Sequence, residues 1–99
     1  MLPDLKDLFG FDWDAGNETK SSVKHDVGVE EAEQVFLNQP LLLLDDPAHS
    51  QKELRFHAFG KTKLDRLLRV TFTVRRKLIR VISVRAMSRR EKKFYESQS

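Results

Sequence analysis

Apolar and polar residues alternate through most of the second half of the chain, a pattern typical of half-buried β-strands. Three stretches carry this pattern, namely residues 53–59, 66–75 and 78–85. Turn-forming residues at positions 60–65 separate the first two stretches, and Arg76 and Lys77 make a tight connection between the last two. Before them, Leu41–Leu44 is an apolar run flanked by prolines and aspartates, which predicts a short buried strand. The three alternating stretches, joined by short connections, predict an antiparallel meander.

Strict alternation also predicts which side chains share a face of each strand. The residues expected on the apolar faces of the first two alternating strands are Leu54, Phe56, Ala58, Leu68, Val70, Phe72 and Val74. In the third strand Arg80 and Arg85 are separated by an odd number of positions, so alternation places them on opposite faces. Arg80 is expected to share its face with Ile82 and Val84.

Residues 11–40 predict a short strand and two helices. Phe11–Trp13 alternates as a strand does, and Asp14 is expected to cap a polar helix that ends near Lys24. A second helix is expected from the N-cap Gly28 to about Asn38, because apolar residues recur at helical spacing before a proline that disfavours further helix.

The last predicted element is a helix that begins with a capping box. Ser88 is followed three positions later by Glu91, and the helix is expected to run to about Ser97. A helix of roughly ten residues is unstable alone, so it must dock, and Phe94 and Tyr95 are its anchors. The elements therefore predict an α+β fold, with N-terminal helices and a C-terminal helix packed on a small antiparallel sheet.

A chain of 99 residues has room for one domain, expected at residues 11–99 after an N-terminal extension of residues 1–10. There is no cysteine, which excludes disulfides, thiolate zinc sites and a cysteine nucleophile. No apolar run approaches the length of a membrane-spanning helix, and no basic stretch followed by an apolar one opens the chain. We therefore expect a cytoplasmic protein without a signal peptide or membrane contact.

Charge is divided unevenly along the chain. Residues 1–50 contain three lysines, no arginine and eleven acids, a net charge of −8. Residues 51–99 contain fifteen basic residues and four acids, a net charge of +11. The asymmetry favours a polyanion such as nucleic acid as a partner of the second half. The alternative is that the acidic half folds against the basic half and cancels its field.

Few residues suggest acid–base or metal chemistry. Asp45, Asp46 and His49 have the types of metal ligands, but this sequence is also an ordinary turn, and we expect no metal and no other cofactor. His25 follows Lys24, where the imidazole either interacts with a helix dipole or accepts a proton.

The polar face of the strand at residues 53–59 holds a glutamate, an arginine and a histidine. Glu53, Arg55 and His57 either bind a phosphate and move a proton or form only a surface ion pair.

Arginines on the predicted strands are the strongest chemical signal. They are Arg55, Arg69, Arg75, Arg80 and Arg85. Arginine suits planar, bidentate phosphate binding, and rigid strands hold charges where a transition state needs them. The last helix mixes cations with rings that can stack on bases, or is simply a solvated amphipathic helix. Its cations include Arg89 and Lys92.

Read together over about residues 11–96, these pieces resemble the BrnT family of ribonuclease toxins from bacterial type II toxin–antitoxin modules. The matching pieces are Phe11-Asp12-Trp13-Asp14, Lys24-His25 with Val27, Glu30-Glu31-Ala32, Val35-Phe36, Asp46-Pro47, His49-Ser50, Glu53 with Arg55-Phe56, Arg66-Leu67-Leu68, Ile79-Arg80-Val81-Ile82-Ser83, Arg85, Arg89, Glu91 and Tyr95. Three positions depart from the family pattern. Asp26 replaces a glycine, Ser21 an asparagine and His57 an aliphatic residue.

The resemblance implies a RelE-like fold and metal-independent cleavage of RNA by its own 2′-hydroxyl, which inhibits translation. It also implies a ribbon-helix-helix (BrnA-like) antitoxin that blocks the toxin, so that operator DNA is contacted only through the antitoxin. The catalytic candidates are Lys24, His25, Glu53, Arg55, Arg80, Arg85 and Tyr95. The RNA-binding candidates are Arg69, Arg75, Arg89 and Lys92.

Each catalytic candidate has an expected role. His25 is the expected acid or base with Lys24 as its electrostatic helper, and Tyr95 stacks on a base or donates a proton. Arg55, Arg80 and Arg85 are expected to clamp the phosphate. Glu53 is expected to orient Arg55. Two other functions remain open, which are a binding module that holds an antitoxin or nucleic acid without cutting it, and a DNA-binding structural protein.

Overall fold

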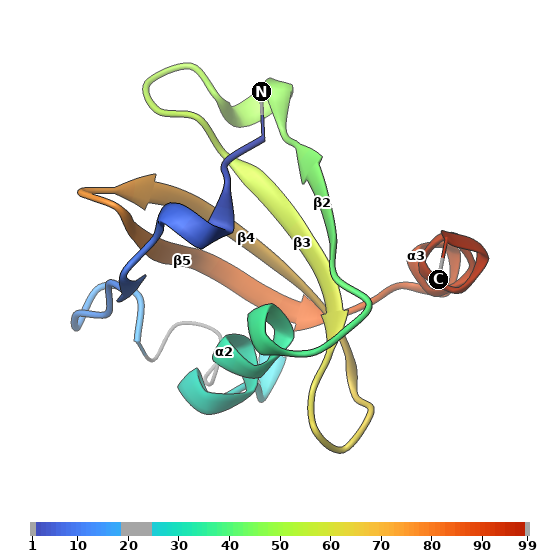
Figure 1. Ribbon diagram of the computed structural model, residues 1–99. Coiled ribbons are helices and arrows are strands. Elements are labelled where there is room, and N and C mark those ends of the chain that lie inside the picture. Colours follow the sequence, from blue (N-terminus) through green and yellow to red (C-terminus); the bar gives the residue numbers. More distant parts are fainter. Residues whose placement is uncertain (1, 19–24, 99) are drawn as a thin grey trace.

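The computed structural model describes residues 2–18 and 25–98, which form a five-stranded sheet with two α-helices and two short 3₁₀ helices (Figure 1). The elements in chain order are η1 (Leu5–Asp7), β1 (Gly10–Phe11), α2 (Val29–Leu37), β2 (Leu42–Asp45), η2 (Pro47–His49), β3 (Phe56–Lys61), β4 (Leu67–Arg75), β5 (Leu78–Ala86) and α3 (Arg89–Gln98). The α+β class expected from the sequence is confirmed.

The sheet is mixed and larger than the small antiparallel sheet that the sequence predicts. Its strand order is β1-β5-β4-β3-β2. The strands β3 to β5 form the expected antiparallel meander, and β2 adds a further antiparallel strand beside β3. β1 adds a parallel strand at the edge, where Phe9 N–H donates to the Lys77 carbonyl and Asp12 N–H to the Ile79 carbonyl. The prediction of a purely antiparallel sheet was wrong because this pairing joins segments far apart in the sequence.

The pair of N-terminal helices is not seen. Residues 15–18 form turns instead of the start of a helix capped by Asp14, and the remainder of that prediction, residues 19–24, lies outside the described residues. The Asp14 carboxylate accepts from the Gly16 N–H at 2.8 Å, a local bond that favours a turn over a helix. The second expected helix is confirmed as α2, with Gly28 as its N-cap and Asn38 as its C-cap.

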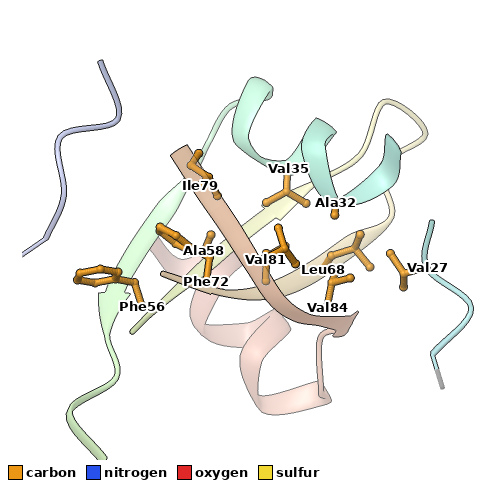
Figure 2. Packing of buried hydrophobic residues seen from close by; sticks show 11 residues of the cluster. Val27, Ala32, Val35, Phe56, Ala58, Leu68, Phe72, Ile79, Val81 and Val84 are labelled. Atoms are coloured by element: carbon orange, nitrogen blue, oxygen red, sulfur yellow. The ribbon is translucent and has the colours of Figure 1, made fainter. Parts of the chain in front are cut away.

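The main core lies between α2 and one face of the sheet (Figure 2). Its buried residues are Val27, Ala32, Val35, Phe56, Ala58, Leu68, Val70, Phe72, Ile79, Val81 and Val84. Gly60 permits the close approach of α2, because a Cβ there would lie 2.9 Å from a methyl carbon of Val35. Leu5 and Leu8 of the N-terminal segment also pack against this core.

A smaller cluster on the other face of the sheet anchors α3. Phe59, Met87 and Tyr95 are buried together, and the Tyr95 hydroxyl donates to the Pro40 carbonyl. The expected capping box is confirmed, since Ser88 N–H donates to Glu91 and Glu91 N–H to the Ser88 hydroxyl. These contacts supply the docking that such a short helix needs.

The strand β5 departs from strict alternation at a β-bulge. Thr71 of β4 pairs with Ser83, whereas the next residue, Phe72, pairs with Val81, so Ile82 is the extra residue. Side chains directly opposite each other lie on the same face of a sheet. Because Val81 and Val84 both enter the core, Arg80 and Arg85 both lie on the opposite face. The expectation that these arginines lie on opposite faces was wrong.

The start of β3 also differs from the prediction. The strand begins at Phe56 instead of residue 53, and Leu54 is 59% exposed instead of facing the core. The chain from Asp46 to Arg55 forms a loop with its own polar contacts, which overrides the alternating pattern there.

A polar face of the sheet as the candidate active site

Three strands direct polar side chains to the face of the sheet opposite α2, which we call the polar face. Its residues are His57 of β3, Arg69, Thr71, Thr73 and Arg75 of β4, and Arg80, Ser83 and Arg85 of β5. The expected gathering of strand arginines on one surface is therefore present for four of the five, and the fifth, Arg55, directly precedes β3.

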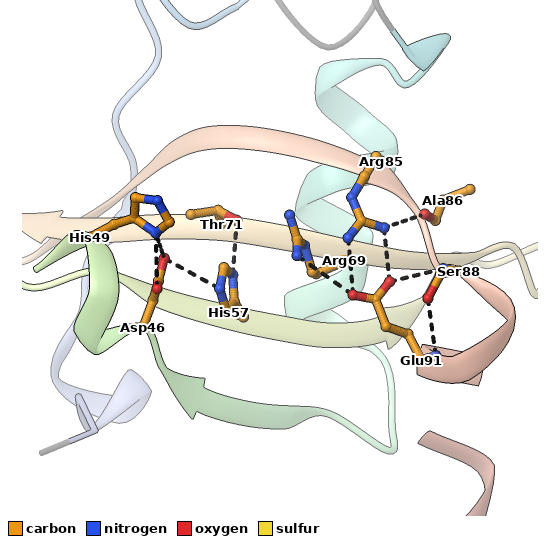
Figure 3. Close-up of polar contacts among 9 residues, drawn as sticks. All are labelled: Asp46, His49, His57, Arg69, Thr71, Arg85, Ala86, Ser88 and Glu91. Carbon is orange, nitrogen blue, oxygen red and sulfur yellow. Dashed lines mark hydrogen bonds and ion pairs between the residues drawn. The ribbon is translucent and has the colours of Figure 1, made fainter. Parts of the chain in front are cut away.

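A carboxylate from α3 binds two of these arginines (Figure 3). Arg85 donates to both oxygens of Glu91, at 2.8 and 3.0 Å, and Arg69 lies 3.5 Å from Glu91. Burial acts to raise the pKa of Glu91, but the hydrogen bonds from Arg85 and from the Ser88 N–H lower it to about 2. Glu91 is thus a fixed negative charge between two cations.

Two histidines share a second carboxylate at the other end of this face (Figure 3). Asp46 lies 3.0 Å from His49 Nδ1 and 3.3 Å from His57 Nε2, and its side chain is only 9% exposed. The second ring nitrogen of His57 contacts the Thr71 hydroxyl at 2.9 Å. Burial acts to raise the pKa of Asp46, but the His49 hydrogen bond and the nearby charges lower it overall.

The environment of His57 favours a neutral ring. Burial lowers its pKa, the Arg69 charge lowers it further, and Asp46 only partly opposes both effects. An ionised carboxylate only accepts, so the His57 Nε2 facing Asp46 carries the hydrogen and Nδ1 accepts from Thr71. Both nitrogens of His57 are therefore engaged.

A short loop holds Asp46 and Arg55 together. The Asp46 N–H donates to the Arg55 carbonyl at 2.9 Å, closing the loop at its base. The Ser50 hydroxyl donates to the Asp46 carbonyl at 2.7 Å and accepts from the Arg55 N–H at 2.9 Å. These hydrogen bonds explain the spacing of the aspartate, serine and arginine in the sequence, because each of the three residues takes part in closing the same loop.

These groups surround a hollow of about 240 Å³ on the polar face. Its lining residues are Asp46, His49, Arg55, His57, Arg69, Thr71, Ile82 and Ser83. A neighbouring hollow is lined in part by Glu53 and shares His49 and Arg55 with the first. The Nε atoms of Arg55 and Arg69 are buried without a hydrogen-bond partner. Because the side chains of Arg55 and Arg69 line the hollow and guanidinium groups bind oxyanions well, the hollow is suited to an anion.

The other arginines of the polar face are paired with acids. Glu53 binds Arg75 through two bonds of 3.0 Å, rather than orienting Arg55 directly. Arg80 lies 3.0 Å from Asp14 and 3.5 Å from Asp12. Acids of the first half of the chain therefore neutralise part of the basic half, as the second interpretation of the charge pattern predicts, while no ion pair is seen for Arg55 among the described residues.

Several expected site residues lie elsewhere. The His25 side chain is exposed and its carbonyl accepts from Arg66 at 3.5 Å, beside the N-terminal end of α2. The Tyr95 ring is buried in the small cluster under α3. Arg89 and Lys92 are exposed on α3, and Lys24 lies outside the described residues.

Sequence reasoning missed the shared role of Asp46 and His49, which it considered only as metal ligands or as part of an ordinary turn. Their spacing of three residues was the available signal, since a single 3₁₀ turn brings such positions together. The Glu91 interaction with Arg69 and Arg85 had no comparable signal, because it joins β4, β5 and α3.

Across residues 2–18 and 25–98, no group of three or more histidine, cysteine, aspartate or glutamate side chains is arranged to hold a metal ion. Within the same ranges, neither α2 nor α3 has the length and apolarity needed to span a bilayer.

Comparison with known proteins identifies a family for this chain. No curated protein matches the chain. A family described as the ribonuclease toxin BrnT of type II toxin–antitoxin systems matches residues 13–91, which include all five strand arginines, Asp46, His49 and Glu91. The match covers well over half of the sequence. The resemblance seen in the sequence is confirmed, and the chain belongs to the BrnT family of ribonuclease toxins.

Proposed function

We propose that this toxin is a metal-independent endoribonuclease that cleaves RNA within the hollow of the polar face. The observation that carries the proposal is the pair of buried, unpartnered guanidinium nitrogens of Arg55 and Arg69 beside two histidines. An RNA phosphodiester supplies the acceptor oxygens that these donors lack.

The chemistry requires three things of the protein. RNA carries its own nucleophile, the 2′-hydroxyl, so the protein must accept a proton, stabilise charge on the phosphorus and allow the 5′-oxygen to leave. Arg55 and Arg69 are the proposed phosphate clamp, and rigid placement is what makes such charges effective in a transition state. His25 and Lys24, the acid–base pair that the resemblance implies, stay a prediction.

The remaining cations are proposed to guide the rest of the RNA. Arg75, Arg80 and Arg85 extend along the same face, and their carboxylate partners leave them able to exchange an ion pair for a phosphate. Arg89 and Lys92 continue the basic surface on exposed positions of α3. Binding is therefore expected to weaken as salt rises.

The family implies an antitoxin as the protein partner. We propose that it is a ribbon-helix-helix protein of the BrnA type, that the complex contacts operator DNA only through it, and that the toxin acts in the cytoplasm by inhibiting translation. The RelE-like relationship likewise stays a prediction.

The test is cleavage of a 5′-labelled single-stranded RNA by purified protein in excess chelator. We expect cleavage that persists without divalent ions and leaves 2′,3′-cyclic phosphate ends, and no cleavage of the all-deoxy version. Arg69→Gln should slow cleavage at least about 100-fold, as loss of a transition-state donor does. Absence of cleavage in chelator, or cleavage of the all-deoxy strand, would contradict the proposal.

One observation favours a second candidate, a binding module that cuts nothing. Glu53, Asp14 and Glu91 already pair with four of the arginines that would otherwise meet a phosphate, since Glu91 contacts both Arg69 and Arg85. This candidate predicts that RNA or antitoxin binds while the labelled RNA stays intact at every protein concentration.

A further inference from the structure

The imidazole of His49 is held by one nitrogen and free at the other. Its Nδ1 lies 3.1 and 3.0 Å from the two oxygens of Asp46 (Figure 3). A carboxylate accepts only, so this nitrogen carries the hydrogen and Nε2 of the neutral ring holds a lone pair. No partner is seen for Nε2 within the described part of the chain, and the side chain is 68% exposed.

The carboxylate that orients His49 is itself fixed from several sides. Asp46 is nearly buried, contacts His57 Nε2 from β3, and has both backbone groups bonded in the loop with Ser50 and Arg55. Such support keeps the His49 ring in one tautomer and one orientation, which is what a proton-transfer group needs.

Other titratable groups of the region are less suited to this task. Both ring nitrogens of His57 are engaged, by Asp46 and Thr71. The hydroxyl of Tyr95 donates to the Pro40 carbonyl inside the small cluster. Glu91 is held by Arg85 and Arg69 as a permanent anion. His49 alone among these four presents an unengaged nitrogen beside the hollow.

His49 also lies where the proposed phosphate would bind. It lines the hollow that Arg55 and Arg69 also line, and it lines the neighbouring hollow as well. The Ser50 hydroxyl links the loop that carries His49 to the backbone of Arg55. The same loop therefore positions both the proton acceptor, His49, and a residue of the phosphate clamp, Arg55.

We infer that His49 is a catalytic residue of RNA cleavage, with Asp46 as its positioning residue; the inference rests on the proposed function. His49 Nε2 accepts the proton of the 2′-hydroxyl as O2′ forms its bond to phosphorus. The bond from phosphorus to O5′ breaks, and O5′ takes a proton from water. The products are a 2′,3′-cyclic phosphate and a 5′-hydroxyl, and the imidazolium returns its proton to solvent.

Single-turnover cleavage in chelator tests the role of His49 with two variants. His49→Ala removes the imidazole, whereas His49→Asn keeps a side-chain N–H near the position of Nδ1 but has no counterpart of Nε2. We expect both to cleave at least about 100-fold more slowly, the effect typical of losing a general base. Both variants should bind the all-deoxy strand with an affinity within threefold of that of the parent. Imidazole in the buffer should raise the cleavage rate of His49→Ala at least tenfold.

Three results would overturn the inference while leaving the proposed function standing. They are cleavage by His49→Ala within threefold of the parent, recovery of the parent rate by His49→Asn, and loss of RNA binding that accounts for the loss of rate. A parent protein that cleaves no RNA in chelator would instead overturn the proposed function, and the inference with it.

Asp46→Asn tests the positioning role. An amide can donate to Nδ1 and so favour the other tautomer, which leaves His49 Nε2 protonated. We expect kcat to fall at least tenfold with KM within threefold, and the imidazole ¹⁵N chemical shifts of His49 to report the exchanged tautomer. Asp7→Asn, which replaces an exposed carboxylate distant in sequence from Asp46, is the matched control. It should change neither kcat nor the ¹⁵N chemical shifts of His49. Unchanged ¹⁵N shifts and unchanged kcat in Asp46→Asn would overturn the role.

Discussion

Arg69 and Arg85 lie directly opposite each other on β4 and β5, and the carboxylate of Glu91 contacts both guanidinium groups. Two like charges facing each other across a sheet are unfavourable by themselves. The desolvation of Arg69 and the charge of Arg85 lower the pKa of Arg69, and Glu91 opposes this effect. The helix α3 therefore stabilises the sheet through charge as well as through its apolar contacts.

The first prediction concerns acid stability. The pKa of Glu91 is lowered from 4.5 to about 2 in the folded protein, so its contribution is present above pH 4.5 and is lost as the pH falls toward about 2. Glu91→Gln should lower the free energy of unfolding by about 3 kcal/mol at pH 7 and flatten its decline between pH 4.5 and 2. Urea unfolding at several pH values measures both.

Glu30→Gln provides the control, because Glu30 is an exposed acid in the first turn of α2. It should change the free energy of unfolding by less than about 1 kcal/mol. Equal pH dependence in the parent and Glu91→Gln would show that Glu91 is not the group that titrates.

A second prediction concerns RNA binding by Arg55, for which no ion pair is seen among the described residues, and by Arg75, which pairs with Glu53. Arg55→Gln should weaken binding of a single-stranded RNA about tenfold, and reduce the slope of log affinity against log salt by about 0.7, the value for one phosphate contact. Arg75→Gln should cost less than about threefold, because Arg75 must give up Glu53 to bind a phosphate. Fluorescence anisotropy at four salt concentrations measures both, and equal losses would contradict this distinction.

A third prediction tests the packing of α2 on the sheet. In Gly60→Ala, the new Cβ would lie 2.9 Å from the Val35 Cγ1 and 3.1 Å from the Val35 carbonyl oxygen. Overpacking against backbone should cost about 2 kcal/mol of unfolding free energy. Gly28→Ala, where nothing lies within 4 Å, should cost less than about 1 kcal/mol. A Gly60→Ala protein as stable as Gly28→Ala would show that helix and sheet separate easily.

The fourth prediction explains a departure from the family pattern. The resemblance implies glycine at position 26, and the φ of Asp26, 54°, lies in the left-handed region that glycine adopts without strain. Asp26→Gly should therefore raise the free energy of unfolding by about 0.5 kcal/mol, and Asp26→Ala should lower it, because aspartate tolerates this conformation better than alanine. Thermal unfolding measures both, and a destabilised Asp26→Gly would show that the aspartate side chain itself stabilises the fold.

The fifth prediction concerns Tyr95. Burial raises the pKa of Tyr95, so its hydroxyl remains a donor to the Pro40 carbonyl at neutral pH. Tyr95→Phe should lower the free energy of unfolding by about 1 kcal/mol. RNA cleavage at a temperature where the variant is folded should stay within twofold of the parent. A large loss of cleavage without a change in stability would instead favour the role in chemistry that the resemblance implies.

Local patterns in the sequence determined most of the secondary structure. The caps of α2, the capping box of α3 and the meander of β3 to β5 follow from residues a few positions apart, and the structure confirms them. The tight connection at Arg76 and Lys77 is confirmed as a turn in which both residues have positive φ. Family membership was also evident, because it depends on the order and spacing of short motifs.

Only the tertiary structure decided which strands pair at the edge of the sheet and which side chains lie on the same face. The bulge at Ile82 brings Arg80 and Arg85 to one face, and it depends on how β5 pairs with β4. The parallel pairing of β1 with β5 likewise depends on a partner distant in sequence. Periodicity describes a strand alone, whereas a bulge or an edge strand is defined by its neighbour.

The candidate site divides in the same way. The sequence determined that arginines gather on the strands, because their positions follow the period of the sheet. It could not decide that Glu53 pairs with Arg75, that Glu91 binds two arginines, or that Asp46 contacts both His49 and His57. Those contacts join side chains from different strands, helices and loops, and their distances exist only once the backbone has folded.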